Sequence, residues 1–322
     1  MNRFVLGKLA AATALAVVSA SASAAWPDRP ITLYLSWSPG GGTDATARII
    51  GTLMEKELGT PVNVVNRPGG NGVVGNQAMA SGKPDGYTIG LISVEISMQH
   101  HMGLTELSPS DYTPLALMNY DPSGVTVSSN SPYKQFEDLI DAAKAAPGKL
   151  KASGTGEGGI WQIALAGMLN SMGLAPDLIR WIPSNGAAPA MLELVAGGVQ
   201  VAPVSLPEAR SMIDSGKAKP LAVMAEHPAA LYPDVPTLKA LTGSDWTMGA
   251  WRGIVAPKGL PDDITAKYIE VLDKINHSDE YRDFMLKQGY GIEWAGGKDF
   301  AEFMARSDAS MGETMKALGL AK

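Results

Sequence analysis

The chain has 322 residues, a formal net charge of −6 at pH 7, 45% hydrophobic residues and no cysteine. The negative charge argues against a nucleic-acid-binding surface, which needs clustered positive charge. The lack of cysteine excludes disulfides, thiolate metal sites and cysteine nucleophiles. The length and composition are consistent with a globular protein of about two domains.

The first 24 residues have the features of a secretory signal peptide. Arg3 and Lys8 precede an apolar run at 9–18 that is too short to span a bilayer, and the small-x-small pattern at 22–24 predicts cleavage after Ala24. Losing these two cations would bring the net charge of the mature chain to about −8. We therefore expect a protein exported to the periplasm without a membrane anchor.

Strands and helices alternate along the mature chain, which predicts an α/β protein. In the first part we expect strands at 31–35, 62–65 and 87–92 and helices at 44–58 and 72–80. After Asp121-Pro122-Ser123-Gly124 we expect helices at 136–145, 160–172, 187–195 and 206–214 and strands at 150–152, 178–182, 199–203 and 221–224. A strand at 251–256 and helices at 261–275 and 278–288 complete the expected elements.

This order predicts two lobes, each a mostly parallel sheet flanked by helices. Lobe one is expected at 25–124 and 250–322, and lobe two at 125–249, with the ligand cleft between them. The lobes are expected to close around a ligand, with hinges near 121–124 and 224–251.

The segment from Trp37 to Arg48 is the most informative one because it contains three consecutive glycines, Gly40 to Gly42, between an expected strand and an expected helix. The glycines therefore lie at a helix N-terminus. Unpaired N–H groups and the helix dipole favour a negative ligand group there, and glycine permits close approach. This pattern predicts a loop that binds a carboxylate or a phosphate.

Two further glycine-rich loops, at 67–75 and 153–159, follow the same strand-to-helix pattern. Loops at the carboxyl ends of strands in two lobes could meet in one cleft. Both loops also contain G-x-G-x-x-G, so an exported dinucleotide-dependent enzyme is an alternative. That spacing alone is weak evidence, and Asp177, at the start of the next strand, does not stand where such a unit needs its acid.

No catalytic residue, metal site or cofactor is predicted. The motifs H-E-x-x-H and G-x-S-x-G are both missing from the sequence. The adjacent His100 and His101, near Glu95 and Glu106, are the one arrangement that suggests a metal. We interpret these two histidines as part of a solvent-facing connection.

Short motifs run through nearly the whole mature chain: WPDRPI at 26–31, PGGGTD at 39–44, VVNRPG at 64–69, PDGYT at 84–88, APGKL at 146–150 and PDVPTL at 233–238. On these motifs the chain resembles the substrate-binding proteins of tripartite tricarboxylate transporters, the Bug or TctC-like receptor family. That resemblance implies a type II periplasmic binding protein that catalyses no reaction. It also implies a small organic carboxylate as ligand and the permease subunits of a membrane transporter as partners. We further expect a monomer with no nucleic-acid partner.

In that family the ligand carboxylate is held mainly by backbone N–H groups, hydroxyls and water from the first strand-to-helix loop and the matching loop of lobe two. On this chain the resemblance assigns these roles to Ser38, Pro39, Gly40, Gly41, Gly42, Thr43, Asp44, Thr155, Gly156, Glu157, Gly158 and Gly159. Gly70, Asn71, Gly72 and Ser205 are second-rank candidates. Asp44 has an equally good structural role, because it could cap the helix and pair with Arg48.

Glu95, Glu157 and Glu208 follow strands or begin helices, and inward-pointing acids would repel a di- or tricarboxylate. We therefore expect a carboxylate whose far end is neutral, hydroxylated or cationic, and a Glu157→Gln change that alters ligand choice. A ligand sensor that presents its closed form to a membrane kinase would use the same clamp and stays an alternative function.

Overall fold

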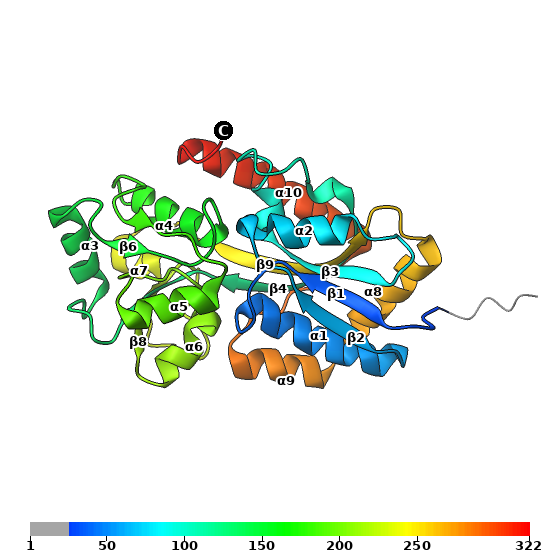
Figure 1. Ribbon diagram of the computed structural model, residues 1–322. Coiled ribbons are helices and arrows are strands. Elements are labelled where there is room, and N and C mark those ends of the chain that lie inside the picture. The colour runs from blue at the N-terminus through cyan, green and yellow to red at the C-terminus, as the bar shows by residue number, and fades with distance from the viewer. Residues whose placement is uncertain (1–25) are drawn as a thin grey trace, which may run out of the picture.

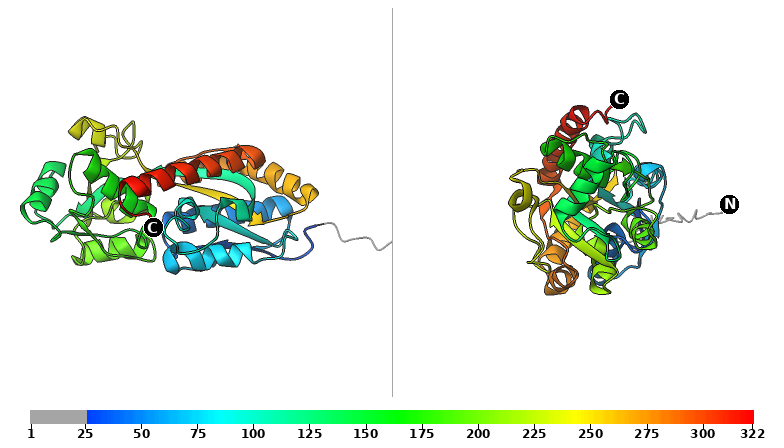
Figure 2. Two further views of the ribbon diagram at one scale, coloured as in Figure 1. Left: turned by 90° about the horizontal axis from the view of Figure 1, so that it is seen from above. Right: turned by 90° about the vertical axis from the view of Figure 1, so that its left-hand side faces the viewer.

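The computed structural model describes residues 26–322, and the structural statements below concern this part of the chain. Two α/β lobes lie end to end, and the larger lobe contains both the N-terminal and the C-terminal parts of the chain (Figure 1, Figure 2). The signal peptide and cleavage site expected in residues 1–24 lie outside the described residues. Within residues 26–322, no helix combines the length and apolarity that crossing a bilayer requires.

Lobe one is built on a six-stranded sheet with the order β10-β4-β9-β3-β1-β2. Its strands are β1 (Ile31–Leu35), β2 (Val62–Asn66), β3 (Thr88–Ser93), β4 (Tyr112–Pro122), β9 (Gly249–Pro257) and β10 (Ala295–Gly296). β1 pairs in parallel with β2 and β3, whereas β9 runs antiparallel to β3 and β4, and β10 antiparallel to β4. The α/β class is confirmed. The sheet is mixed where the sequence predicts a mostly parallel one, because the chain leaves the lobe through β4 and returns through β9.

Helices cover both faces of this sheet. α1 (Gly42–Leu58), α8 (Asp262–Asn276) and α9 (Asp279–Gln288) pack on one face, and α2 (Val73–Ala80) and α10 (Gly297–Ala317) on the other (Figure 1). α1 buries Ala47, Ile50 and Met54 against β1, at the spacing of one helix face. It ends at Gly59, whose φ of 66° is a left-handed conformation that glycine adopts without strain.

Lobe two contains smaller sheets and shorter helices. The strands are β5 (Gly124–Ser128), β6 (Lys151–Ala152), β7 (Arg180–Trp181) and β8 (Ala218–Val223). The helices are α3 (Phe136–Ala145), α4 (Ile160–Ser171), α5 (Ala187–Ala196), α6 (Leu206–Asp214) and α7 (Leu238–Thr242). β5 pairs antiparallel with β8, and β6 pairs in parallel with β7. The segment expected to be a strand at 199–203 forms only single bridges, from Val201 to Ala152 and from Ala202 to Thr126, and these bridges link the two small sheets.

The chain crosses between the lobes twice. β4 ends at Pro122 just before β5, and β9 begins at Gly249 after the segment that contains α7. The pairing of β4 with β9 extends to this crossing, where Pro122 lies opposite Gly249. The lobe boundaries and hinges expected from the sequence fall near these two points and stay a prediction.

Candidate ligand-binding cleft

A small cavity lies between the two lobes, and residues of both lobes line it. Its lining comprises Trp37, Ser38, Gly41, Gly42, Thr43, Ser93, Glu95, Ala250 and Arg252 from lobe one and Thr155, Ile160, Trp161, Gly186, Ala187 and Glu208 from lobe two. The cavity has a volume of about 20 Å³. That volume is close to what a single buried water needs, so the cleft is nearly closed.

Hydrogen bonds join the lobes at the rim of the cleft. The Ser38 N–H donates to the carbonyl oxygen of Asn185 at 3.2 Å, and the Asn71 side-chain amide donates to the carbonyl oxygen of Glu157 at 2.9 Å. Together with the small cavity, these contacts show that the structure is in a closed arrangement.

The segment from Ser38 to Asp44, which includes the start of α1, contributes four of its seven candidate residues to the cavity, namely Ser38, Gly41, Gly42 and Thr43. A Cβ at Gly42 would lie 2.7 Å from Arg252 Nη2 and 2.9 Å from Glu208 Oε1, so a larger residue there would displace these two charged groups. Pro39, Gly40 and Asp44 do not line the cavity.

Asp44 has a structural role in this loop. Its carboxylate accepts hydrogen bonds from the Gly40 N–H, the Arg48 guanidinium and the Asn66 side-chain amide, each at 3.0 Å. Burial raises the pKa of Asp44, but the bonds from Arg48, Gly40 and Asn66 outweigh it and hold the pKa below its usual value. The predicted pairing with Arg48 is confirmed.

The matching loop of lobe two contributes Thr155 to the cavity, whereas Gly156, Glu157, Gly158 and Gly159 do not line it. Thr155 is 4% exposed, and its Oγ1 has no hydrogen-bond partner among the described residues. The exposed Glu157 carboxylate instead accepts from the Gln162 side chain at 3.2 Å.

The second-rank candidates lie beside the cavity. Gly70 and Asn71 line an adjoining groove together with Gly156 and Glu157, and Gly72 packs against Trp37. Ser205 is buried at the start of α6, and its hydroxyl donates to Glu208 Oε2 at 3.2 Å. Ser205 thus orients a residue of the cavity.

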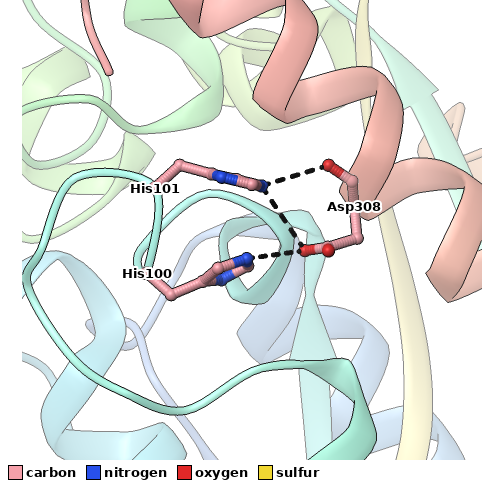
Figure 3. Close-up of side chains that lie close together, drawn as sticks. All are labelled: His100, His101 and Asp308. Carbon is pink, nitrogen blue, oxygen red and sulfur yellow. Dashed lines mark hydrogen bonds and ion pairs between the residues drawn. The ribbon is translucent and has the colours of Figure 1, made fainter. Parts of the chain in front are cut away.

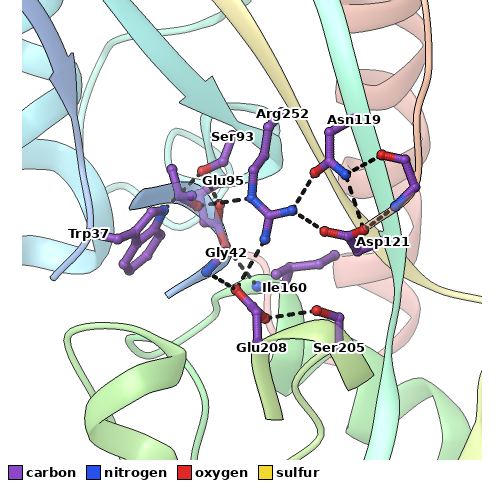
Figure 4. Close-up of polar contacts among 12 residues, drawn as sticks. Trp37, Gly42, Ser93, Glu95, Asn119, Asp121, Ile160, Ser205, Glu208 and Arg252 are labelled. Atoms are coloured by element: carbon purple, nitrogen blue, oxygen red, sulfur yellow. Dashed lines mark hydrogen bonds and ion pairs between the residues drawn. The ribbon is translucent and has the colours of Figure 1, made fainter. Parts of the chain in front are cut away.

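Arg252 forms the centre of a buried ionic network on the floor of the cleft (Figure 4). Its guanidinium donates to Asn119, to Asp121, to Thr43 Oγ1 at 3.0 Å and to Glu208 Oε1 at 3.0 Å. Burial alone would lower the pKa of Arg252, but the nearby Asp121 and Glu208 carboxylates raise it above its usual value.

Glu208 crosses the cleft to reach lobe one. Besides its ion pair with Arg252, its Oε1 accepts from the N–H of Gly42, the first residue of α1, at 3.2 Å. Burial raises the pKa of Glu208, and the Arg252 charge opposes that shift.

Glu95 makes the reciprocal contact from lobe one. Its Oε1 accepts from the N–H of Ile160, the first residue of α4, at 3.4 Å, and its Oε2 accepts from the Ser93 hydroxyl (Figure 4). Glu95 is 2% exposed, and burial raises its pKa despite these hydrogen bonds. The Trp37 indole N–H donates to the same Ser93 hydroxyl at 3.1 Å, which fixes the ring against the cavity.

A second cluster of ionisable groups lies outside the cleft, where His100 and His101 meet Asp308 of α10 (Figure 3). His100 Nε2 is 3.1 Å and His101 Nε2 3.8 Å from Asp308 Oδ1. One ligand atom from each residue lies within 4.8 Å of the others, so these three residues have the spacing of a metal site. The acidic partner is Asp308, whereas Glu95, which the sequence suggested, lies in the cleft.

The sequence patterns did not select Arg252, which lines the cavity, or Asp121, which pairs with Arg252 behind it. The sequence contains a feature that could have identified Arg252, because it is the single charged residue in the otherwise apolar strand β9. Trp37 and Trp161 line the cavity, whereas Trp251 does not.

Two lobes joined by two crossings, with a small cavity between them that hydroxyls and helix N-termini line, are the architecture of a solute-binding protein. The family model described as "Tripartite tricarboxylate transporter family receptor" matches residues 46–320. The chain therefore belongs to this family, whose members are periplasmic substrate-binding receptors and not enzymes. The alternative of a dinucleotide-dependent enzyme is set aside by this membership.

Similar proteins agree with the assignment. A Cupriavidus necator protein named "UPF0065 protein in gbd 5'region" is 31% identical over 98% of this chain and 96% of its own. A TctC solute-binding protein from Polaromonas, solved without ligand, is 34% identical over 91% of this chain and 100% of its own, with a TM-score of 0.66. An R. palustris protein solved with adipate is 23% identical over 92% of this chain and 99% of its own, with a TM-score of 0.86, and shows the same fold.

Proposed function

We propose that this protein captures a small organic carboxylate between its lobes and delivers it to a membrane transporter of the tripartite tricarboxylate type. The observation that carries the proposal is the small cavity between the lobes, at which helices from both lobes begin. A helix N-terminus that no carboxylate of the protein contacts, such as that of α5, stabilises a negative ligand group through its N–H groups and the helix dipole. Export through the signal peptide, with cleavage after Ala24, would place this site in the periplasm.

The arrangement of the lobes supports a clamp that closes on its ligand. The two hydrogen bonds that join the lobes at the rim of the cleft, and the small volume of the cavity, support this proposal.

The test is a thermal-shift screen of the chain 25–322 against mono-, di- and tricarboxylates, aromatic acids, amino acids and NAD. A ligand at 100 times its dissociation constant stabilises the folded state by about 2.7 kcal/mol, which is a readily measured shift. We expect a selective shift with one class of carboxylate. A shift with NAD alone, or with none of these compounds, would contradict the proposal.

Delivery is tested separately by uptake of the identified acid into cells. Loss of this receptor and loss of the cognate permease should abolish the same high-affinity uptake. Uptake that persists without the receptor, in cells that retain the permease, would argue instead for the sensor function.

A further inference from the structure

Three helices begin at the cavity, and two of their N-termini already contact a carboxylate of the opposite lobe. Glu208 of lobe two accepts from Gly42 at the start of α1, and Glu95 of lobe one accepts from Ile160 at the start of α4. The protein thus places its own carboxylates where a ligand carboxylate would otherwise bind.

The third helix, α5, differs from the other two. Its first residue, Ala187, and the preceding Gly186 both line the cavity, and its N-terminus has no side-chain cap. Among the described residues, no carboxylate accepts a hydrogen bond from the first turn of this ten-residue helix. The positive end of its dipole is therefore available to an anion.

A buried hydroxyl without a partner, that of Thr155, lines the same cavity and lies against Gly159 at the start of α4. The Thr155 Oγ1 has no hydrogen bond within residues 26–322. The carbonyl oxygen of Thr155 accepts from the Ser184 N–H at 2.8 Å, so the Thr155 loop is tied to the segment that leads into α5. Because the hydroxyl and the N-terminus of α5 line one cavity, both can donate to an acid that occupies it.

The charges around the cavity oppose a second ligand carboxylate. Glu95, Glu208 and Asp121 supply three carboxyl groups, and Arg252 is the one cation of the described chain that lines this cavity. Four of the five guanidinium N–H donors of Arg252 already bond to Asn119, Asp121, Thr43 and Glu208. Arg252 therefore pairs with Asp121 and Glu208 and has one N–H donor left for a ligand.

Glu95 is suited to accept a hydrogen bond from a ligand. Its Oε1 bonds only to the distant Ile160 N–H at 3.4 Å, while a carboxylate has about four acceptor positions. No basic side chain forms an ion pair with it in the described part of the chain.

We propose that Glu95 and Glu208 are specificity-determining residues, which restrict the ligand to an acid with one carboxylate and an ammonium or hydroxyl group at its other end. The carboxylate binds at Thr155 and the N-terminus of α5, and the donor group at the far end donates to Glu95. Glu208 and Glu95 together repel a second carboxylate. This inference rests on the proposed function, because it assumes that the cavity binds an organic acid.

The test compares acids of equal length by calorimetry: succinate with 4-aminobutyrate and 4-hydroxybutyrate, and adipate with 6-aminohexanoate and 6-hydroxyhexanoate. In the unsubstituted chain, the amino or hydroxy acid of at least one series should bind at least tenfold more tightly than its dicarboxylate. Glu95→Gln should reduce that ratio to about one, and Glu208→Gln should increase affinity for the dicarboxylate about tenfold. The control Glu313→Gln, on an exposed part of α10, should leave the ratio unchanged.

Tighter binding of the dicarboxylates by the unsubstituted chain would overturn the specificity proposal and leave the proposed function standing. A ratio that Glu95→Gln leaves unchanged, with the variant folded by circular dichroism, would overturn it as well. If none of these acids and none of the wider panel binds, the proposed function fails, and this inference fails with it.

Discussion

The N-termini of α1 and α4 are two helix starts that meet the same cleft under different electrostatic conditions. At α1, the incoming carboxylate of Glu208 also pairs with Arg252 at 3.0 Å, and Arg252 pairs in turn with Asp121. At α4, the incoming carboxylate of Glu95 has a hydroxyl and a 3.4 Å amide contact but no ion pair among the described residues. The carboxylate at the first helix thus has a cation beside it, whereas the carboxylate at the second has none among the described residues.

The largest expected effect comes from removing the cation at the α1 end. Arg252→Met leaves Asp121 and Glu208 buried without their partner, and breaking such a pair typically costs about 3–5 kcal/mol. We expect urea denaturation to show a loss of this size. Lys267→Met removes an exposed pair with Glu270 and should cost less than about 1 kcal/mol. Equal losses in the two variants would show that the buried network contributes no more to the free energy of unfolding than an exposed ion pair does.

A smaller effect is expected from each carboxylate that crosses the cleft. Glu208→Gln replaces charged hydrogen bonds worth about 1.5–3 kcal/mol in the closed arrangement, so the ligand-free protein should open. Small-angle scattering should show a larger radius of gyration for Glu208→Gln than for Glu95→Gln, because Glu95 forms the weaker interlobe contact. If Glu95→Gln opened the protein more than Glu208→Gln, the conclusion that Glu95 forms the weaker interlobe contact would be wrong.

The smallest effect is a pH dependence that belongs to Glu95. Burial raises its pKa above the ordinary value of 4.5, so the folded state holds this proton more tightly than the unfolded state does. Stability should therefore fall as pH rises from 4.5 through the raised pKa and then level off, at a slope of up to about 1.4 kcal/mol per pH unit. Urea titrations across this pH range should show this fall in stability for the unsubstituted chain and not for Glu95→Gln. Parallel profiles would contradict it, since Glu208 is present in both proteins.

The pH dependence of stability that Asp44 contributes runs in the opposite direction to that of Glu95. The pKa of Asp44 is lowered, so the stability that it contributes is present above its unfolded value of 3.8 and is lost as pH falls below that value. Asp44→Asn should accordingly flatten the acid end of the profile and leave the region above pH 4.5 unchanged.

Local patterns in the sequence predicted many of the elements. The strand at 31–35 and the helices at 136–145 and 206–214 have the predicted bounds, because their apolar residues recur with one clear period. β4 was not predicted, since Pro114, Asn119 and Asp121 interrupt its apolar pattern. α10 was also missed, although Phe300, Met304, Met311 and Met315 recur at helical spacing along its buried side.

The cleft was predicted in outline but not in its ionic detail. Three glycines before a helix identified the loop at 38–44, and strand ends identified Glu95 and Glu208 as acids that could point inward. The network needs Asp121, Glu208 and Arg252 together, and these residues lie on β4, α6 and β9. A pairing over 131 residues of sequence leaves no local pattern, so only the folded chain reveals it.

The antiparallel pair of β4 and β9 determines which atoms move when the cleft opens. Asp121 and Arg252 lie on these two strands, which stay paired as far as Pro122 and Gly249, whereas Glu208 lies on α6 beyond the crossing. We therefore expect Asp121 and Arg252 to move as one body with lobe one, while Glu208 departs with lobe two. Opening then breaks one buried ion pair together with the hydrogen bonds that cross the cleft, and it requires no sheet to deform.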